Sequence, residues 1–395
     1  MRPLSNWDDW ISSKLDRLER DGLMRRLRPG DRTGPRTVAR DGRELVNFSS
    51  NDYLGLSQHP GVLAAAERDL QKGTGATASR LMAGTDHDYT ALENAVAFFK
   101  GTEAALVFGS GYLANVGTIP ALVGRHDAVF SDRLNHASIV DGIRLSGAQM
   151  FRYRHNDVAE LQQMLDECRD AKRKLIVTET LFGMDGDLAP LERIVELKER
   201  YGAALMVDEA HAVGVLGPQG RGLAHAAGVA DRVDLHMGTF SKAVGLYGGY
   251  VAARESWIRY LVNAARSFVY TTALPPSVVG GISAALEFVL AADYERERIA
   301  ELSGRFRQGL EGLGLDRGGS VSQIQPVMFG GAAEVVDLGR RLEKRGVLAV
   351  PIRPPTVPQG GARLRFSICA SHTEQDIDLA LSSLDQVARE LTRAG

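Results

Sequence analysis

The sequence predicts an α/β fold in which helices cover a mostly parallel sheet, followed by a smaller α+β C-terminal domain. Its 395 residues are enough for two domains, each with its own core. Between about Leu92 and Gly280, short apolar runs alternate with helical stretches, a pattern typical of parallel strands joined by helices. We predict an N-terminal helix and hairpin segment over residues 1–50, a large domain over 51–280 and a small domain over 281–395.

The composition is that of a soluble globular protein with a formal net charge of −2. This balance gives no electrostatic reason to expect nucleic acid or an anionic membrane as a partner. Cys168 and Cys369 cannot build a disulfide framework, the chain lacks a signal-peptide pattern, and charges interrupt every long apolar stretch. We therefore expect a cytoplasmic protein without a membrane segment, and we predict no metal site.

Local elements are expected before the large domain. Residues 7–27 carry apolar side chains at helical spacing between charges, which predicts an amphipathic helix packed on a larger body. Residues 38–48 alternate and contain Asp41-Gly42, which predicts a β-hairpin. The polar, turn-rich residues 49–55 then open the large domain.

Short apolar runs predict strands at Ala104–Val107, Ala128–Phe130, Leu175–Thr178 and Ala204–Val207, with a further run at Val233–Gly238. After Pro275-Pro276, a helical stretch is expected through about Leu313. Weaker strands near residues 325–327, 347–350 and 363–367, and a final helix from Thr373, complete the small domain.

Asp208 and Lys242 are the residues that most clearly indicate chemistry. Asp208 ends the apolar run 203–207, so its side chain is expected at the carboxyl end of a buried strand, where α/β sheets bind ligands. Lys242 follows the run 233–238 and is expected at the same edge. A Schiff-base lysine beside an acid for the pyridine nitrogen is what pyridoxal phosphate requires of a protein.

The surroundings of Lys242 strengthen this interpretation. By itself Asp208 could be a helix cap, and Lys242 could be an ordinary surface lysine. However, Thr239 and Ser241 place hydroxyls beside the lysine, and glycines follow at 245, 248 and 249, where backbone can approach a phosphate closely.

Two nucleotide-binding alternatives are weaker. Asp208-Glu209-Ala210-His211 matches a helicase motif and would indicate a nucleic-acid remodeller, but the chain contains no Gly-Lys dipeptide for the required phosphate loop. The turn Gly109–Asn115 leads from a strand into a helix and suits phosphate. With Ala114 it also fits a relaxed dinucleotide fingerprint, yet no clear strand-end acid follows about 20 residues later.

His136 lies in Asn135-His136-Ala137-Ser138, directly after the predicted strand at 128–130. It is therefore expected at the same sheet edge as Asp208 and Lys242. A single histidine is more often structural than catalytic, but an aromatic ring at this edge can stack on a cofactor ring, and this convergence favours a functional role.

Several motifs occur in a fixed order along the chain. They are Asn47–Leu56, Gly111-Tyr112, Asn135–Ser138, Asp208–His211, Thr239–Lys242 and Tyr270–Pro276. With them the chain resembles the α-oxoamine synthases nearly from end to end. The segments Ile324–Val327 and Ile352–Pro358 are similar to the biotin-pathway members of that family, which join a pimeloyl thioester to L-alanine. A sibling synthase that uses glycine or serine with another acyl thioester is the alternative.

The resemblance implies a fold-type I pyridoxal-phosphate domain, a homodimer with active sites at its interface, and catalytic roles for Lys242, His136 and Asp208. Lys242 would carry the cofactor, Asp208 would pair with its ring nitrogen, and His136 would stack on the ring and also contact substrate near the reacting acyl group. The remaining cofactor contacts implied are His211 at the phenolic oxygen, and Gly111, Tyr112 and Thr239 at the phosphate, joined by Thr271 or Thr272 of the partner chain.

The resemblance also implies substrate contacts. Arg365 would pair with the amino-acid carboxylate, with Asn51 and Arg353 nearby. Arg25 and Thr356 would contact the pimeloyl group, which is carried on coenzyme A or an acyl-carrier protein.

The chain departs from the family pattern at several positions. The family usually has serine at the position of Gly183, so one hydroxyl contact to the cofactor is missing, and Gly361 replaces a common threonine. Arg26 and Arg28 compete with Arg25 for the acyl contact.

Overall fold

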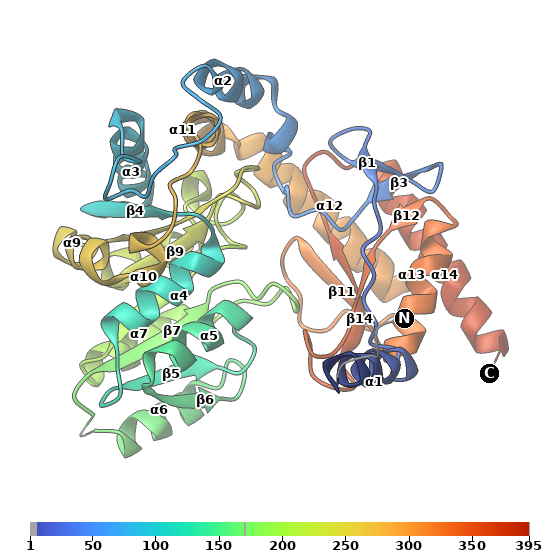
Figure 1. The fold of residues 1–395 in the computed structure, drawn as a ribbon. Helices are drawn as coiled ribbons and strands as arrows, with labels where there is room; N and C mark the ends of the chain where they lie inside the picture. Colours follow the sequence, from blue (N-terminus) through green and yellow to red (C-terminus); the bar gives the residue numbers. More distant parts are fainter. Residues whose placement is uncertain (1–5, 170, 395) are drawn as a thin grey trace. The chain divides into compact units, whose positions relative to one another are not determined.

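The computed structural model describes residues 6–169 and 171–394 (Figure 1). The backbone groups into two compact units. Unit 1 holds the described chain up to Ser50, Met184–Gly186 and the chain from Ala300, and unit 2 holds Asn51–Gly183 and Asp187–Ile299. The predicted domain boundaries at residues 50 and 280 stay predictions, while the compact units divide the chain after Ser50 and after Ile299.

A seven-stranded sheet forms the centre of unit 2, in the order β4-β10-β9-β8-β7-β5-β6. Only β10 runs against its neighbours, β4 and β9, so the sheet is mostly parallel as predicted. The predicted strands of this domain are confirmed. The bounds are β4 (Ala104–Phe108), β5 (Ala128–Asp132), β6 (Gln149–Tyr153), β7 (Lys174–Glu179), β8 (Ala204–Asp208), β9 (Leu235–Thr239) and β10 (Gly249–Ala253).

Helices cover both faces of this sheet because its strands are apolar on both sides. In β8, Met206 joins the core beneath α4, α5 and α9, while Leu205 and Val207 join the opposite core beneath α6 and α7. The helices around the sheet are α3 (His87–Lys100), α4 (Gly111–Leu122), α5 (Ala137–Ser146), α6 (Val158–Glu167), α7 (Leu191–Arg200), α8 (Leu223–Ala226), α9 (Glu255–Ala264) and α10 (Arg266–Val269). Short 3-10 turns occur at η1 (Leu56–Gln58), η2 (Pro218–Gly220) and η3 (Ala230–Arg232).

The long helix expected after Pro275-Pro276 is two helices, α11 (Pro276–Ala291) and α12 (Asp293–Gly312), with a bend of 69° between them. α11 packs against α2 (Pro60–Leu70), where a Cβ at Gly280 would lie 1.8 Å from Asp69 Oδ2 (Figure 1). The close approach therefore requires glycine. In residues 6–169 and 171–394 no single helix is long and apolar enough to cross a membrane, and α11 with α12 meets that criterion only as a bent pair.

Unit 1 contains two small sheets, β1-β2-β3-β12 and β11-β14-β13. Phe48, Phe306 and Phe366 lie in its core with apolar side chains of α12, α13 and α14. The C-terminal strands and final helix are therefore confirmed. The bounds are β1 (Asp31–Arg32), β2 (Thr37–Arg40), β3 (Arg43–Asn47), β11 (Ile324–Gly330), α13 (Ala332–Glu343), β12 (Val347–Leu348), β13 (Val350–Ile352), β14 (Ala362–Ser367) and α14 (Glu374–Ala394).

The two N-terminal predictions have different outcomes. The hairpin is confirmed, because β2 and β3 pair antiparallel around Asp41 and Gly42, both of which have positive φ. The helix expected over residues 7–27 is too long: α1 (Asn6–Arg20) ends where Gly22 takes a φ of 66°. Packing on a larger body is also wrong for this single chain, since no described residue of α1 is buried and Trp7 is 71 % exposed.

A charged histidine stabilises the end of β6 in unit 2. His155 contacts Asp132 through Nδ1 at 3.1 Å and Asp187 through Nε2 at 2.6 Å. Burial by itself would lower the pKa of His155, but the two carboxylates outweigh it and raise the pKa to about 10. His155 is therefore a cation at neutral pH. Its positive charge lies between the carboxylates of Asp132 and Asp187 and reduces the repulsion between them.

We predict a pH-dependent loss of stability in His155→Gln. The folded pKa of His155 lies above the unfolded value of about 6.5, so its stabilising contribution is complete below that value and disappears as pH rises through about 10. The variant should be less stable by roughly 2–4 kcal/mol near pH 6.5, and the difference should shrink toward pH 10. Urea unfolding between pH 6 and 10 measures this, with the exposed His126→Gln as control. A difference that did not change with pH would contradict a charged His155.

Candidate active site

The carboxyl ends of parallel strands bring several predicted side chains to one edge of the unit 2 sheet. Asp208 ends β8 and Glu179 ends β7, and the two residues are register partners. His136 follows β5, and Lys242 follows β9. Open α/β sheets bind their ligands at this edge, so the predicted grouping of Asp208, His136 and Lys242 has a structural basis.

Asp208 is a buried acid bound only by neutral donors in the described chain. Its Oδ1 accepts the backbone N–H of Ala210 at 3.0 Å, and its Oδ2 accepts Nδ2 of Asn115 at 2.9 Å. Within residues 6–169 and 171–394 no cationic side chain forms an ion pair with it, although it is only 4 % exposed. Because buried charges are normally paired, this carboxylate suits a cationic ligand.

Glu179 is a second buried acid beside Asp208. Its Oε1 accepts the backbone N–H of His136 at 2.7 Å, and its Oε2 accepts that of Gly183 at 3.3 Å. Burial first, and then the charge of Asp208, raise the pKa of Glu179 to about 8. Glu179 therefore joins the two backbone segments on either side of it and carries a proton over much of the neutral range.

His136 is the N-cap of α5, where its side chain accepts the backbone N–H of Ser138. Its Nδ1 lies 2.7 Å from Ser138 Oγ, and Ser138 in turn accepts Nδ2 of Asn115 at 2.9 Å. Desolvation lowers the pKa of His136, and the charge of Lys242 lowers it further, against the opposite effect of Asp208. His136 and Asp208 are thus linked by hydrogen bonds through Ser138 and Asn115.

Lys242 lies in a turn just after β9 and is partly buried. Its charge acts on the pKa of both His136 and Glu179, which puts the ammonium group within electrostatic reach of each. The turn requires glycine at 245, where φ is 82° and a Cβ would lie 2.4 Å from the backbone nitrogen of Ser57. The backbone geometry therefore fixes the position of the lysine.

His211 is buried, with Nδ1 2.8 Å from the hydroxyl of Tyr53, and that hydroxyl donates to Asn51 Oδ1 at 3.1 Å. A Cβ at Gly183 would lie 2.3 Å from His211 Nε2. The His211 ring thus fills the space that a serine at 183 would need. The departure at Gly183 is matched to the position of His211 in this chain.

The predicted phosphate contacts lie at the start of α4. The Oγ of Ser110 caps the helix by accepting the N–H of Leu113 at 3.2 Å, and a Cβ at Gly111 would lie 3.4 Å from Cβ of Thr239. A Cβ at Gly249 would lie 2.6 Å from the Gly111 nitrogen, so the backbones meet closely here. A helix N-terminus beside a threonine hydroxyl suits a phosphate group.

Other predicted cofactor residues have less direct evidence. The side chain of Tyr112 is exposed, and its hydroxyl donates to Asp141 Oδ2 at 2.8 Å. Thr271 and Thr272 follow α10, and Thr272 forms an isolated bridge with Ser79. Their contact with a partner chain stays a prediction.

Four predicted substrate residues belong to unit 1. Arg25 donates to Thr356 Oγ1 at 3.2 Å, and Arg353 donates to the carbonyl of Met24. Arg365, on β14, is buried and donates to Ser367 Oγ at 2.8 Å. Asn51 and His136, the other two predicted substrate residues, belong to unit 2.

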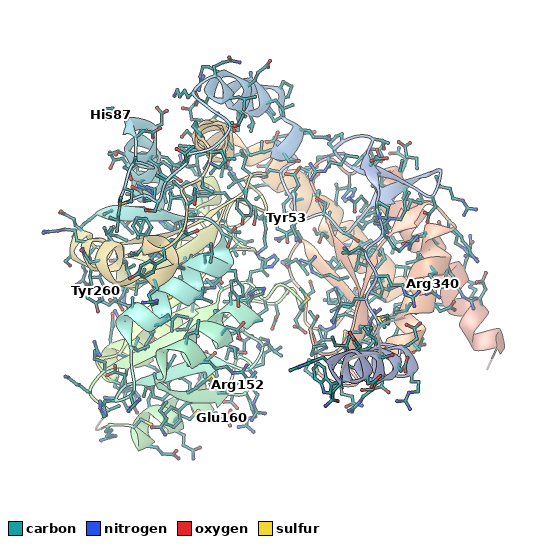
Figure 2. All side chains as sticks on the ribbon, viewed as in Figure 1. Tyr53, His87, Arg152, Glu160, Tyr260 and Arg340 are labelled. Carbon is teal, nitrogen blue, oxygen red and sulfur yellow. The ribbon has the colours of Figure 1, made fainter. Side chains whose placement is uncertain are left out.

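Arg353 lies in a region of excess positive charge. It is 9 % exposed, and burial followed by the charges of Arg25 and Arg340 lowers its pKa. Figure 2 labels Arg340, which lies on α13. In the described part of the chain Nε of Arg353 has no hydrogen-bond partner, and none of these three arginines forms an ion pair. By contrast, Arg26 pairs with Glu19 and Arg28 with Glu343.

Glu209, next to Asp208, points into a separate buried network. Its Oε2 lies 2.5 Å from Lys100 Nζ and 3.3 Å from His236 Nδ1, and neither Lys100 nor Glu209 is exposed. Burial opposes ionisation, but the charge of Lys100 lowers the pKa of Glu209. The second acid of the Asp-Glu-Ala-His motif therefore has a structural partner inside the protein.

Comparison with known proteins agrees with this geometry. The model of the family "Aminotransferase class I and II" matches residues 43–384. An 8-amino-7-oxononanoate synthase of Geobacter sulfurreducens is 50 % identical, over 96 % of this chain and 98 % of that protein. A structure of SPT with a PLP internal aldimine has a TM-score of 0.93 at 33 % identity, covering 99 % of this chain and 100 % of that one. An 8-amino-7-oxononanoate synthase from Francisella tularensis has a TM-score of 0.76 at 28 % identity, with coverages of 88 % and 99 %.

The chain belongs to the aminotransferase class I and II family, and its fold is that of the fold-type I pyridoxal-phosphate-dependent transferases. Its curated relatives named above are 8-amino-7-oxononanoate synthases, which confirms the resemblance to the α-oxoamine synthases and the predicted enzyme class, a pyridoxal-phosphate-dependent acyltransferase.

Sequence reasoning missed Glu179, Asn115 and Ser138. Glu179 had a signal, because it follows the apolar run 175–178 just as Asp208 follows 203–207. Asn115 and Ser138 lie inside motifs that were identified, but a hydrogen bond between two helices cannot be read from either motif separately.

We predict that Glu179→Gln changes how stability depends on pH. The folded pKa of Glu179 lies above the ordinary value of 4.5, so the native protein binds a proton that the unfolded chain has lost, and stability falls as pH rises from about 4.5 to about 8. Relative to the original protein, the variant should therefore gain about 3 kcal/mol between pH 5 and pH 8. Urea unfolding of dialysed, cofactor-free protein measures this, with the exposed Glu196→Gln as control. Parallel pH profiles for the original and Glu179→Gln proteins would refute the assignment.

Proposed function

We propose that this enzyme condenses L-alanine with a pimeloyl thioester, with loss of carbon dioxide, to give 8-amino-7-oxononanoate for biotin synthesis. The acyl carrier is coenzyme A or an acyl-carrier protein, and the enzyme works as a cytoplasmic homodimer. The observation that carries the proposal is the pair of buried acids, Asp208 and Glu179, beside Lys242 at the carboxyl edge of the sheet. The names of the curated relatives support the choice of product.

The residues at this edge fit pyridoxal phosphate as the cofactor. Asp208, a buried acid with only neutral donors among the described residues, suits a protonated pyridine nitrogen. Lys242 is the proposed covalent attachment point, and the start of α4 with Thr239 is the proposed phosphate site. When bound, the cofactor supplies an electron sink for negative charge on the α-carbon of the amino acid.

The protein's own groups would then move and hold the reacting atoms. The Lys242 amine would take the α-proton of the amino acid, and the His136 ring would lie against the cofactor and help to hold it. His211 and Tyr53 form a hydrogen-bonded pair that would orient the cofactor's phenolic oxygen. The carboxyl group of Asp208 would hold the ring nitrogen, and a negative charge there favours removal of the α-proton.

The arginines of unit 1 support an acyl substrate that ends in a carboxylate. Three positively charged side chains have no ion-pair partner in the described chain, namely Arg353, Arg25 and Arg340. The buried Nε–H of Arg353 also has no acceptor there, so it is available to donate to a ligand. Guanidinium groups bind carboxylates with directed, charge-assisted hydrogen bonds. A pimeloyl thioester has such a carboxylate at its far end. Arg365 is proposed to hold the carboxylate of the amino acid.

A sibling synthase is the second candidate, because the chain also resembles SPT structures closely. A substrate panel separates the two. Release of carbon dioxide with pimeloyl thioester and L-alanine supports our proposal, whereas turnover only with glycine or serine and an acetyl or palmitoyl thioester would replace it.

We predict that Lys242→Ala abolishes product formation, by roughly 10⁴-fold or more, because both the attachment point and the base are lost. The visible absorbance of the lysine-bound cofactor should disappear, while the circular dichroism spectrum should match the original. The exposed Lys344→Ala is the matched control and should keep both activity and absorbance. Full activity in Lys242→Ala would exclude the assignment.

We predict that Arg353→Met selectively weakens binding of acyl chains that carry a free carboxylate. Hydrogen bonds to charged groups contribute about 1.5–3 kcal/mol, so KM for pimeloyl thioester should rise roughly 10- to 100-fold. For an uncharged thioester of equal length it should change by less than about twofold. Arg345→Met, which removes a pair with Glu390 elsewhere in unit 1, is the control. An equal loss with both thioesters would argue against carboxylate recognition by Arg353.

A further inference from the structure

We propose that Ser138 and Asn115 are positioning residues that hold His136 as a neutral imidazole protonated at Nε2, so that it offers the substrates an N–H donor and not a base. Each hydrogen bond in the series from His136 to Asp208 has a defined direction. Its structural half stands by itself, and its catalytic half rests on the proposed acyl transfer.

The first step is that two donors converge on Nδ1 of His136. The backbone N–H of Ser138 points at Nδ1 from 3.2 Å, and Ser138 Oγ lies 2.7 Å from the same atom. A backbone N–H can only donate. A proton on Nδ1 would face that N–H directly, so Nδ1 is the acceptor in both contacts.

The second step is that Asn115 sets the direction of the Ser138 hydroxyl. Nδ2 of Asn115 lies 2.9 Å from Asp208 Oδ2 and 2.9 Å from Ser138 Oγ. An ionised carboxylate only accepts, so the NH₂ group of the amide must face Asp208. Its second hydrogen then goes to Ser138 Oγ, which leaves the single hydroxyl proton of Ser138 to be donated to His136.

The three side chains that carry these hydrogen bonds to His136 are buried, which restricts how they can be arranged. Asn115 and Asp208 are 0 % and 4 % exposed, and Ser138 is 1 % exposed. In residues 6–169 and 171–394 Oδ1 of Asn115 has no partner, so the hydrogen bonds of this side chain are the two made by Nδ2. The backbone N–H of His136 donates to Glu179, which holds the backbone that carries the ring.

The charges around His136 agree with a neutral ring. The titratable groups that face it are Asp208, Asp141 and Lys242, together with Glu179 at its backbone. Asp208 and Asp141 favour the cation, but desolvation and Lys242 oppose it, and the pKa of His136 is lowered. With Nδ1 an acceptor and the ring neutral, the proton must be on Nε2.

A fixed Nε2–H donor has a specific use in acyl transfer. After Lys242 has taken the α-proton, the α-carbon of the amino acid forms a bond to the thioester carbonyl carbon and the carbon–sulfur bond breaks. The sulfur leaves as a thiol after taking that proton back from Lys242. Negative charge develops on the carbonyl oxygen while the new bond forms. A preorganised N–H donor stabilises such an oxygen, and His136 keeps its proton throughout.

The test measures the tautomer directly. In protein labelled with ¹⁵N-histidine, with and without cofactor, the two ring nitrogens of His136 give separate signals that distinguish a protonated from an unprotonated nitrogen. We expect Nε2–H with unprotonated Nδ1 between pH 6 and 8, assigned by loss of the signals in His136→Gln. A proton on Nδ1 in the original protein would overturn the proposal.

Variants test the two positioning residues. Ser138→Ala should move the tautomer equilibrium about tenfold toward Nδ1–H and raise the pKa of His136 by about one unit, because a hydroxyl donor is lost. Asn115→Leu should shift the tautomer equilibrium and the pKa of His136 in the same direction as Ser138→Ala does. Ser138→Thr keeps the hydroxyl and should restore the original signals. An unchanged tautomer in both Ser138→Ala and Asn115→Leu would overturn the proposal.

Thr118→Val is the matched control. Thr118 lies on the same helix as Asn115, is fully buried, and within the described chain its hydroxyl has no partner. The control should leave the His136 signals and the kinetics unchanged. If it shifts them as Ser138→Ala does, the effect belongs to general packing and the proposal fails.

Kinetics test the catalytic half. In Ser138→Ala, kcat with the acyl thioester should fall about tenfold, while KM for the amino acid should change by less than about twofold. A shifted tautomer with unchanged kcat would overturn the donor role of His136. If the original protein shows no acyl transfer at all, the proposed function fails instead, while the tautomer measurement still decides the structural half.

Discussion

The site depends on the register of β7 against β8, which places the carboxyl groups of Glu179 and Asp208 side by side at the buried end of the sheet. Two acids in one desolvated place are unfavourable unless a proton or a cation compensates them. Without a ligand, a proton on Glu179 provides that compensation, which is why its pKa is raised. A cationic ligand held at Asp208 would provide the same compensation, so the pairing of these two strands creates a place that suits positive charge.

Strand alternation gives the Asp-Glu-Ala-His motif two separate roles. Asp208 faces the site, where it is bound by the neutral amide of Asn115, while Glu209 is buried against Lys100 and His236. Leaving either Lys100 or Glu209 without the other would expose an uncompensated charge to the protein interior, a far larger cost than the pair itself gains. The Lys100–Glu209 ion pair thus holds the end of β8 in the protein interior, while the carboxyl group of Asp208 faces the candidate site.

Much of the fold could be predicted because its signals are local. The parallel strands of unit 2 are apolar on both faces, and Asp41-Gly42 has the backbone preferences of a hairpin turn. The one helix that was predicted too long also fails for a local reason. α1 ends at Arg20 because Gly22 adopts a left-handed conformation, so the helix does not continue although the apolar spacing does. The single helix expected from residue 276 is bent after Ala291. Helical periodicity does not reveal this bend, because the residues on both sides of it are helical.

The sequence by itself determined the class of sheet, the order of the motifs, and the lysine and acid expected at its carboxyl edge, because strand periodicity and strand-end chemistry are properties of neighbouring residues. Only the tertiary structure decided that Glu179 is the neighbour of Asp208, that the ring of His211 occupies the space beside Gly183, and that Asn115 joins Ser138 to Asp208. These contacts join residues from 23 to 93 positions apart in the chain. Their existence depends on how strands and helices pack, and packing is set by the whole core together and not by any one segment.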